Sequence, residues 1–216
     1  SKYSILEAKK YASKQINKKI KKRLNYHACD ANEVMLEEKF DFLIFYRSLH
    51  HFANIPKLFK NLNKFTKRNC KIIVCEPMRQ NFERKNAIFA NLLRMTCQTW
   101  QSYEKKIPNI GINYKFIRNN EKQVLNEYKY KSNKKKYTQS PMDNSIDDPI
   151  RLIKELKKFY KINKIEYFDA FVDKLIGGLR GKDRLKLARL LKEFDNYLIK
   201  ERILKGTTLF FSGNKK

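Results

Sequence analysis

Two adjacent histidines and one glutamate are the residues whose types best suit chemistry on a bound molecule. His50 and His51 follow a short apolar run, and Glu76 ends a second one. A histidine titrates near neutral pH, so either one could take the proton that an attacking hydroxyl or amine loses. Glu76 could orient such a group. The structural alternatives are that one histidine hydrogen-bonds a loop backbone and that Glu76 pairs with one of the many lysines.

The two apolar runs that precede these residues predict β-strands. FDFLIFY from Phe40 and KIIVCEP from Lys71 are short and rich in β-branched and aromatic residues, which is unlike a buried helix. Neither run alternates cleanly between apolar and polar residues, so we expect a parallel sheet that is covered on both faces. Between the runs, Pro56 stands in the first turn of a segment with helical spacing of Ile55, Leu58, Phe59, Leu62 and Phe65.

A third strand is predicted at residues 25–29, just before these two. The chain then offers three places where a strand ends: Asp30-Ala31, Tyr46-Arg47-Ser48 and Glu76-Pro77. In open α/β sheets, ligands bind beyond the carboxyl ends of the parallel strands. We therefore expect the three strand ends to converge on one pocket.

The order of these residues resembles the class I S-adenosylmethionine-dependent methyltransferases. The resemblance lies in an acidic residue and Ala after the third strand, FD opening the fourth, SLHH after it, and EP closing the fifth. It covers about the first eighty residues, and GTTLFFSGNKK more loosely as the closing strand. It implies an α/β fold with a Rossmann-like, mostly parallel sheet, a C-terminal antiparallel strand and helices on both faces.

The resemblance also implies a cofactor, S-adenosylmethionine, and residues that bind it. Asp30 would accept a hydrogen bond from the adenine amino group, and Ala31 would bring a backbone amide to the ring. Tyr46, Arg47 and Ser48 would lie along the methionyl part, where the Tyr46 ring face favours the cationic sulfur. The alternatives are that Asp30 is a loop carboxylate or a helix cap and that Tyr46 is a core residue at the end of the sheet.

The chain begins inside a helical pattern, SKYSILEAKKYASKQINKKIKK. In the family that it resembles, this helix follows the second strand. The Gly-rich loop after the first strand and the acid that holds the cofactor ribose would lie upstream of Ser1. We therefore expect an N-terminally truncated domain, a fragment that binds the donor poorly and is inactive by itself.

Size and composition favour one domain over residues 1–216, because no Pro-, Ser- or Gly-rich linker divides the chain. The formal net charge of +27 could attract RNA, DNA or an anionic membrane surface. Lysine is scattered along the whole chain, however, which favours solvated lysine faces. No apolar run approaches the ~20 residues that a membrane-spanning helix needs, and no signal peptide is present. We expect a cytoplasmic protein.

The four cysteines predict no metal site. Cys29, Cys70, Cys75 and Cys97 lack the spacing of zinc ligands. They are typical of small buried apolar residues in a reducing compartment.

The rest of the chain predicts a polar, lysine-rich insertion or lid at about 108–147, followed by further helices and strands. A helix enters at 148–149, a strand covers KINKIEYFDAFV, LIGGLRG forms a turn, and TTLFFSG is the last strand. The helix DRLKLARLLKEFDNYLIK carries an expected core stripe of Leu187, Leu190, Leu191, Phe194 and Leu198.

The leading interpretation is a methyltransferase that acts on a small-molecule acceptor. One alternative directs the same chemistry at RNA or DNA, but YRSLHH stands where enzymes that methylate exocyclic base amines carry an Asn/Asp-Pro-Pro-aromatic stretch. The other is a non-catalytic basic fragment that no longer binds the donor. The pattern indicates neither the acceptor nor the oligomeric state.

Overall fold

The computed structural model describes residues 2–15, 17–52, 54–96, 113–128 and 149–216. The chain divides into two compact units. Unit 1 comprises Ser1–Phe40 and Asn54–Lys67, and unit 2 comprises Asp41–Ala53 and Arg68–Lys216. The single domain over 1–216 stays a prediction.

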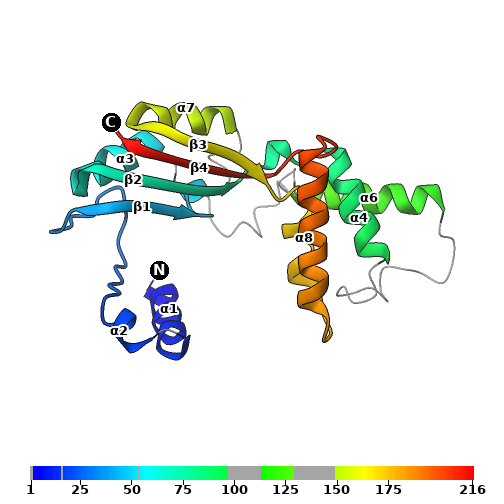
Figure 1. The fold of residues 1–216 in the computed structure, drawn as a ribbon, viewed down its shortest axis with the longest axis horizontal. Helices are drawn as coiled ribbons and strands as arrows, with labels where there is room; N and C mark the ends of the chain where they lie inside the picture. The colour runs from blue at the N-terminus through cyan, green and yellow to red at the C-terminus, as the bar shows by residue number, and fades with distance from the viewer. Residues whose placement is uncertain (1, 16, 53, 97–112, 129–148) are drawn as a thin grey trace. The chain divides into compact units, whose positions relative to one another are not determined.

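Unit 1 is helical. It holds α1 (Lys2–Gln15), α2 (Lys18–Lys21), α3 (Ile55–Leu62) and the short 3-10 helix η2 (Asn63–Phe65) (Figure 1). The helix α3 is the one predicted between the two apolar runs. The Asn54 side chain caps it by accepting a hydrogen bond from the Lys57 amide at 2.9 Å, and a proline lies in its first turn.

Residues 25–29, predicted to form a strand, do not form one. The segment is exposed apart from Tyr26, which is half-buried, and none of the described strands pairs with it. A strand needs the backbone N–H and C=O groups of a neighbour. The prediction was wrong because the short stretch around Tyr26 carries too little apolar side chain to hold a strand in place.

The sheet lies almost entirely in unit 2 and is mixed. Its order is β1-β2-β4-β3, with β1 (Phe40–Tyr46), β2 (Thr66–Pro77), β3 (Tyr160–Phe168) and β4 (Thr208–Lys215). β4 runs antiparallel to both of its neighbours, so that Phe211 lies between Val74 and Ile165. β1 and β2 point the same way (Figure 1). The predicted α/β fold with a C-terminal antiparallel strand is confirmed.

Unit 2 also holds helices that follow the strands. These are α4 (Arg84–Thr96), α6 (Tyr114–Tyr128), α7 (Pro149–Phe159) and α8 (Arg184–Lys200), with the 3-10 helices η1 (Leu49–His51), η3 (Arg79–Asn81), η4 (Val172–Lys174) and η5 (Ile176–Gly178). α6 lies inside the stretch 108–147 that was predicted as a polar insertion or lid, where no helix was predicted. The remainder of that stretch, 108–112 and 129–147, lies outside the described residues.

A cluster of buried apolar residues in unit 2 joins α4, α6 and α8. Side chains from the turn after β3 fill it, together with Phe82, Ala87, Ala90, Val124, Leu191 and Leu198. No strand residue belongs to this cluster of described residues, so the helices form a core of their own.

Of the cysteines, Cys70 is buried as predicted, whereas Cys29 is exposed. In the described ranges, no helix has the length and apolar character needed to cross a membrane.

Candidate active site

Glu76 organises the turn that follows β1. The side chain is fully buried near the end of β2. Its Oε1 accepts hydrogen bonds from the backbone amides of Ser48 at 2.5 Å and Leu49 at 2.7 Å. Its Oε2 accepts a hydrogen bond from Nδ1 of His50 at 2.7 Å. One carboxylate thus fixes both the backbone of the SLHH turn and the orientation of an imidazole.

The His50 ring lies in a protected position. Its side chain is 17% exposed, and the ring of His51 lies 4.1 Å away, centroid to centroid, at a tilt of 47°. When Nδ1 of a neutral imidazole donates, the other ring nitrogen is the proton acceptor. The contact with Glu76 therefore selects the tautomer in which Nε2 can take up a proton.

Arg47 connects this turn to the sheet. Its amide donates to the Cys75 carbonyl at 2.8 Å, and its backbone has a φ of 49°, which turns the chain away from β1. Its guanidinium lies 3.2 Å from Asp173 and 5.9 Å from the ring centroid of Tyr46. The Tyr46 residue is 67% exposed, so it is not a core residue at the end of the sheet.

Asp30 and Ala31 lie in unit 1, whereas the other candidate residues lie in unit 2. Asp30 Oδ1 accepts hydrogen bonds from the backbone and side-chain amides of Asn32 at 2.8 and 2.9 Å, and these bonds lower the pKa of the exposed carboxyl. The Ala31 carbonyl accepts a hydrogen bond from Asn61 on α3. Asp30 is thus a carboxylate in a loop here. Its role toward an adenine stays a prediction. Because residues 25–29 form no strand, only the ends of β1 and β2 remain of the three strand ends that were expected to converge.

A pocket of about 150 Å³ lies beyond the end of β2. It is lined by Pro77, Met78, Arg79, Phe82, Glu127, Tyr128, Lys174 and Thr207. We did not predict Tyr128 or Lys174, because they lie far along the chain from the strand-end motifs. Arg79 could have been found, because it follows the EP pair by only two residues.

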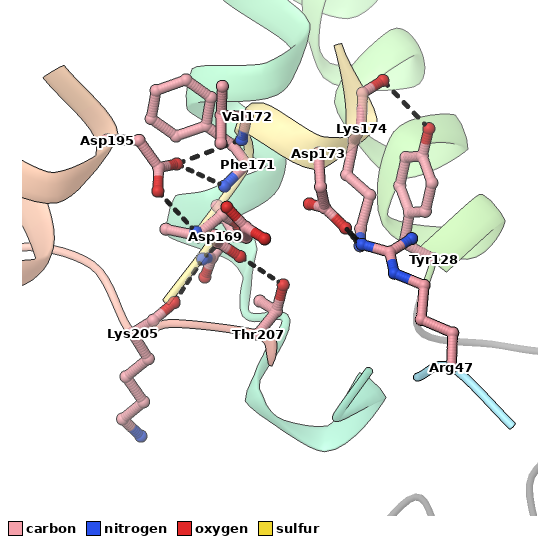
Figure 2. A network of polar contacts seen from close by, with 12 residues as sticks. Arg47, Tyr128, Asp169, Phe171, Val172, Asp173, Lys174, Asp195, Lys205 and Thr207 are labelled. Carbon is pink, nitrogen blue, oxygen red and sulfur yellow. Dashed lines mark hydrogen bonds and ion pairs between the residues drawn. The ribbon is translucent and has the colours of Figure 1, made fainter. Parts of the chain in front are cut away.

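A network of polar contacts holds the walls of this pocket (Figure 2). Asp173 accepts hydrogen bonds from Arg47 and from Lys174, whose Nζ is 2.5 Å away. Lys174 and Arg94 both lie 5.3 Å from the ring centroid of Tyr128, and Arg94 donates to the phenol oxygen at 2.5 Å. Burial raises the pKa of Tyr128, so the phenol stays protonated at neutral pH.

A second buried carboxylate, Asp195 on α8, fixes the turn after β3. It accepts hydrogen bonds from the amides of Ala170, Phe171 and Val172 at 2.8–3.0 Å, and Figure 2 shows these bonds side by side. Burial raises the pKa of Asp195 against the effect of these bonds. This turn also holds Thr207, whose amide donates a hydrogen bond to the Asp169 carbonyl at 3.1 Å.

No cluster of three or more His, Cys, Asp or Glu side chains arranged to hold a metal ion occurs among the residues described. Among the described residues, the candidate site presents acids, bases and an aromatic ring. The pair formed by Glu76 and His50 can accept a proton, and the turn after β1 presents Tyr46 to solvent.

The sequence comparison identifies a family for the first third of the chain. Residues 3–74 match the model of a family described as methyltransferase domain. No curated protein matches the chain.

Two solved structures are similar at low identity. PKMT2 from Rickettsia typhi is 16% identical with a TM-score of 0.29, and the match covers 81% of this chain and 35% of that one. A cyclopropane-fatty-acyl-phospholipid synthase-like protein from Lactobacillus casei ATCC 334 is 14% identical with a TM-score of 0.28, and the match covers 83% of this chain and 57% of that one. This chain therefore spans about a third of the length of PKMT2 and just over half of the length of the synthase-like protein.

The matched segment 3–74 contains Asp30, Ala31, β1 and the SLHH turn, which are the features that carry the resemblance seen in the sequence. The resemblance is thereby confirmed over residues 3–74, which match a methyltransferase domain.

Proposed function

We propose that this protein transfers a methyl group from S-adenosylmethionine to a small-molecule acceptor, with His50 as the proton acceptor and Glu76 as its positioning residue. The observation that supports this proposal is the double use of Glu76, which binds two amides of the SLHH turn through one oxygen and Nδ1 of His50 through the other. A purely structural acid would not need a titratable partner.

The mechanism follows from this contact. When bound, S-adenosylmethionine supplies an electrophilic methyl group, whose bond to sulfur breaks as the acceptor atom bonds to its carbon. His50 takes up the acceptor's proton at Nε2 as the new bond forms. Glu76 keeps the ring in the tautomer that allows this, and it stabilises the imidazolium that results. The low exposure of His50 limits the competition from water.

The residues after β1 fit a sulfonium donor. The amides of Arg47, Ser48 and Leu49 all donate within the protein, so they are not available to an anion. The exposed Tyr46 ring already has the guanidinium of Arg47 within 6 Å of its centroid, so the face of this ring tolerates a cation. Tyr46 would therefore lie beside the sulfur.

Donor binding is tested by calorimetry with S-adenosylhomocysteine on the full-length product of the coding sequence. Tyr46→Ala should weaken binding roughly threefold to tenfold, because the cation–π contribution is lost. Phe42→Ala is the matched control, since Phe42 is also an exposed aromatic on β1. Absence of binding heat in the wild-type protein would reject the proposal and favour a non-catalytic fragment.

The proton acceptor is tested by measuring S-adenosylhomocysteine release with a panel of small hydroxyl, amine and carboxylate compounds. His50→Gln should lower the rate about 10²-fold. His51→Gln is the control, because His51 is the neighbouring imidazole, and it should change the rate less than about threefold if the base is His50. Equal losses in the two variants would contradict the assignment.

An RNA or DNA acceptor is the alternative that the net charge of +27 favours. Binding of a short RNA or DNA duplex that weakens steeply with added salt, together with methylation of that duplex, would replace the small-molecule proposal. Methylation of a small compound in the absence of nucleic acid would show that the reaction does not require RNA or DNA as the acceptor.

A further inference from the structure

The pocket beyond β2 is lined by both apolar and charged side chains. Met78 and Phe82 are its buried apolar residues. Arg79, Glu127 and Lys174 supply charged groups to the lining. A ligand that fills this pocket must therefore bring both an apolar body and a charged or polar end.

The charges of the lining differ in whether they are already paired. Glu127 has its own partner, Nη1 of Arg94 at 2.7 Å, and Lys174 has Asp173 at 2.5 Å. Within the described parts of the chain, no ion pair joins Arg79 to a carboxylate. Arg79 is half-buried, and cations removed from water are normally paired. A bound anion would therefore pair with Arg79 rather than with Lys174.

The wider surroundings have the same sign. Of the two carboxylates, Glu127 pairs with Arg94, and Asp173 pairs with both Lys174 and Arg47. Among the residues that line the pocket there are two cations, Arg79 and Lys174, and one carboxylate, Glu127. This excess of one positive charge in the lining favours an anion over an amine.

The size of the pocket limits the ligand. Its volume is about 150 Å³, which is comparable to an apolar cavity that accommodates benzene. The aromatic ring of Tyr128 and the side chain of Phe82 offer contacts to a flat apolar body. A planar guanidinium matches a carboxylate or phosphate with two parallel hydrogen bonds.

We propose that this pocket binds a small organic anion, a carboxylate or a phosphate monoester on a body about the size of a benzene ring, with Arg79 as its counter-ion. The proposal deepens the function above by giving the chemical class of the methyl acceptor, and it rests on that function only for this identification. The pocket adjoins Pro77, the residue that follows Glu76. The acceptor would thus enter next to the strand end that holds His50.

The test measures binding without the donor. Benzoate and phenyl phosphate are titrated by ligand-observed NMR, with benzamide as the neutral analogue and benzylamine as the cationic one. Either anion should bind more tightly than benzamide, and the two anions separate a carboxylate from a phosphate preference. Arg79→Gln should weaken anion binding roughly tenfold or more, and Arg79→Lys should restore part of it.

Arg189→Gln is the matched control, because Arg189 is an exposed arginine of α8 that does not line the pocket. It should leave anion binding unchanged within about twofold if the effect is local. Benzamide or benzylamine binding as tightly as the anions, or equal losses in Arg79→Gln and Arg189→Gln, would overturn the proposal.

The two proposals fail separately. Anion binding that depends on Arg79 in a protein without heat for S-adenosylhomocysteine leaves the pocket assignment in place and removes the methyltransferase activity. S-adenosylhomocysteine binding with no affinity for benzoate or phenyl phosphate does the opposite. Methylation of an anionic compound that falls in Arg79→Gln with a rise in KM supports both.

Discussion

Glu76 and Asp195 perform the same structural task in two regions of unit 2. Each is a fully buried acid that accepts hydrogen bonds from consecutive backbone amides of a turn after a strand. They differ in their remaining contact. Glu76 keeps Oε2 for the imidazole of His50, whereas both oxygens of Asp195 are used by the backbone.

This difference distinguishes a residue of the candidate site, Glu76, from a residue that only holds the backbone around the site, Asp195. We call that backbone, the turn after β3 together with Thr207, the frame of the site. A carboxylate that bonds only to backbone amides fixes a turn, and its loss is expressed in stability. A carboxylate that also orients a titratable ring affects proton transfer as well. The Asp195 turn carries Asp169, which holds Thr207 at the rim of the pocket. Asp195 thus builds the frame around the site in which Glu76 takes part.

The largest expected effect is on stability, from Asp195→Ala. The change leaves three buried amides without an acceptor, so we expect a loss of about 3–5 kcal/mol in the free energy of unfolding. Urea denaturation measures it. Asp183→Ala is the control, because Asp183 precedes the same helix and makes no side-chain capping bond, and it should cost less than about 0.5 kcal/mol. A similar loss in both variants would remove the special role of Asp195.

The next effect is on the rate, from Glu76→Gln. The amide oxygen of glutamine still accepts hydrogen bonds from the SLHH turn, so we expect a stability loss of only about 1 kcal/mol. Its NH₂ group faces Nδ1 of His50, which must then accept, and the proton moves to Nε2. We expect the rate of methyl transfer to fall about 10²-fold, which corresponds to about 2.7 kcal/mol.

A double variant distinguishes positioning by Glu76 from simple loosening of the turn. If Glu76 acts through His50, adding Glu76→Gln to His50→Gln should lower the rate by less than about threefold. Losses that multiply in the double variant would show that Glu76 acts independently of His50, and the comparison with Asp195 would no longer hold.

A smaller loss of stability is expected at Gly206, which precedes Thr207 in the frame held by Asp195. A Cβ at this position would lie 2.6 Å from the backbone nitrogen of Phe168, so the end of β3 must shift. We expect Gly206→Ala to cost about 1–3 kcal/mol. Gly177→Ala is the matched control, because its added methyl group would meet no atom within 4 Å apart from those of its chain neighbours and its own helical turn. Gly206→Ala should have a lower midpoint temperature of thermal unfolding than Gly177→Ala. Equal midpoint temperatures would contradict the close approach.

Much of the fold could be predicted because its signals are local. The apolar runs of β1, β2, β3 and β4 and the spacing of α3 are contained in short stretches. The stripe of α8 shows where this fails: Leu191 and Leu198 are buried, but Leu190 is 65% and Phe194 44% exposed. Asp195 occupies the buried face between the two leucines, and an apolar pattern treats an aspartate as a surface residue.

The candidate site was predicted only in part for the same reason. Residue types placed His50 and Glu76 at neighbouring strand ends, and the structure brings them together. Their contact spans 26 positions along the chain, so no local pattern could show that Glu76 is buried and already bonded to the turn. The pocket depends on still more distant segments, since Arg79 precedes α4 and Lys174 follows β3.

The smallest effect is a pH dependence that belongs to Asp195. Burial raises the pKa of Asp195 in the folded protein, so the native state binds this proton more tightly than the unfolded chain does. The stabilisation that results is fully present below the ordinary carboxyl pKa and is lost as the pH rises through the raised value. Asp195→Asn cannot titrate, so its deficit relative to wild type should be largest near pH 4 and should narrow by less than about 1 kcal/mol toward pH 7. Urea unfolding at several pH values measures the gap. A deficit that widens as the pH rises would mean that the hydrogen bonds from the three amides, rather than burial, set the direction of the pKa shift of Asp195. The likeness between Asp195 and Glu76 would then lie in their hydrogen bonds and not in the effect of burial.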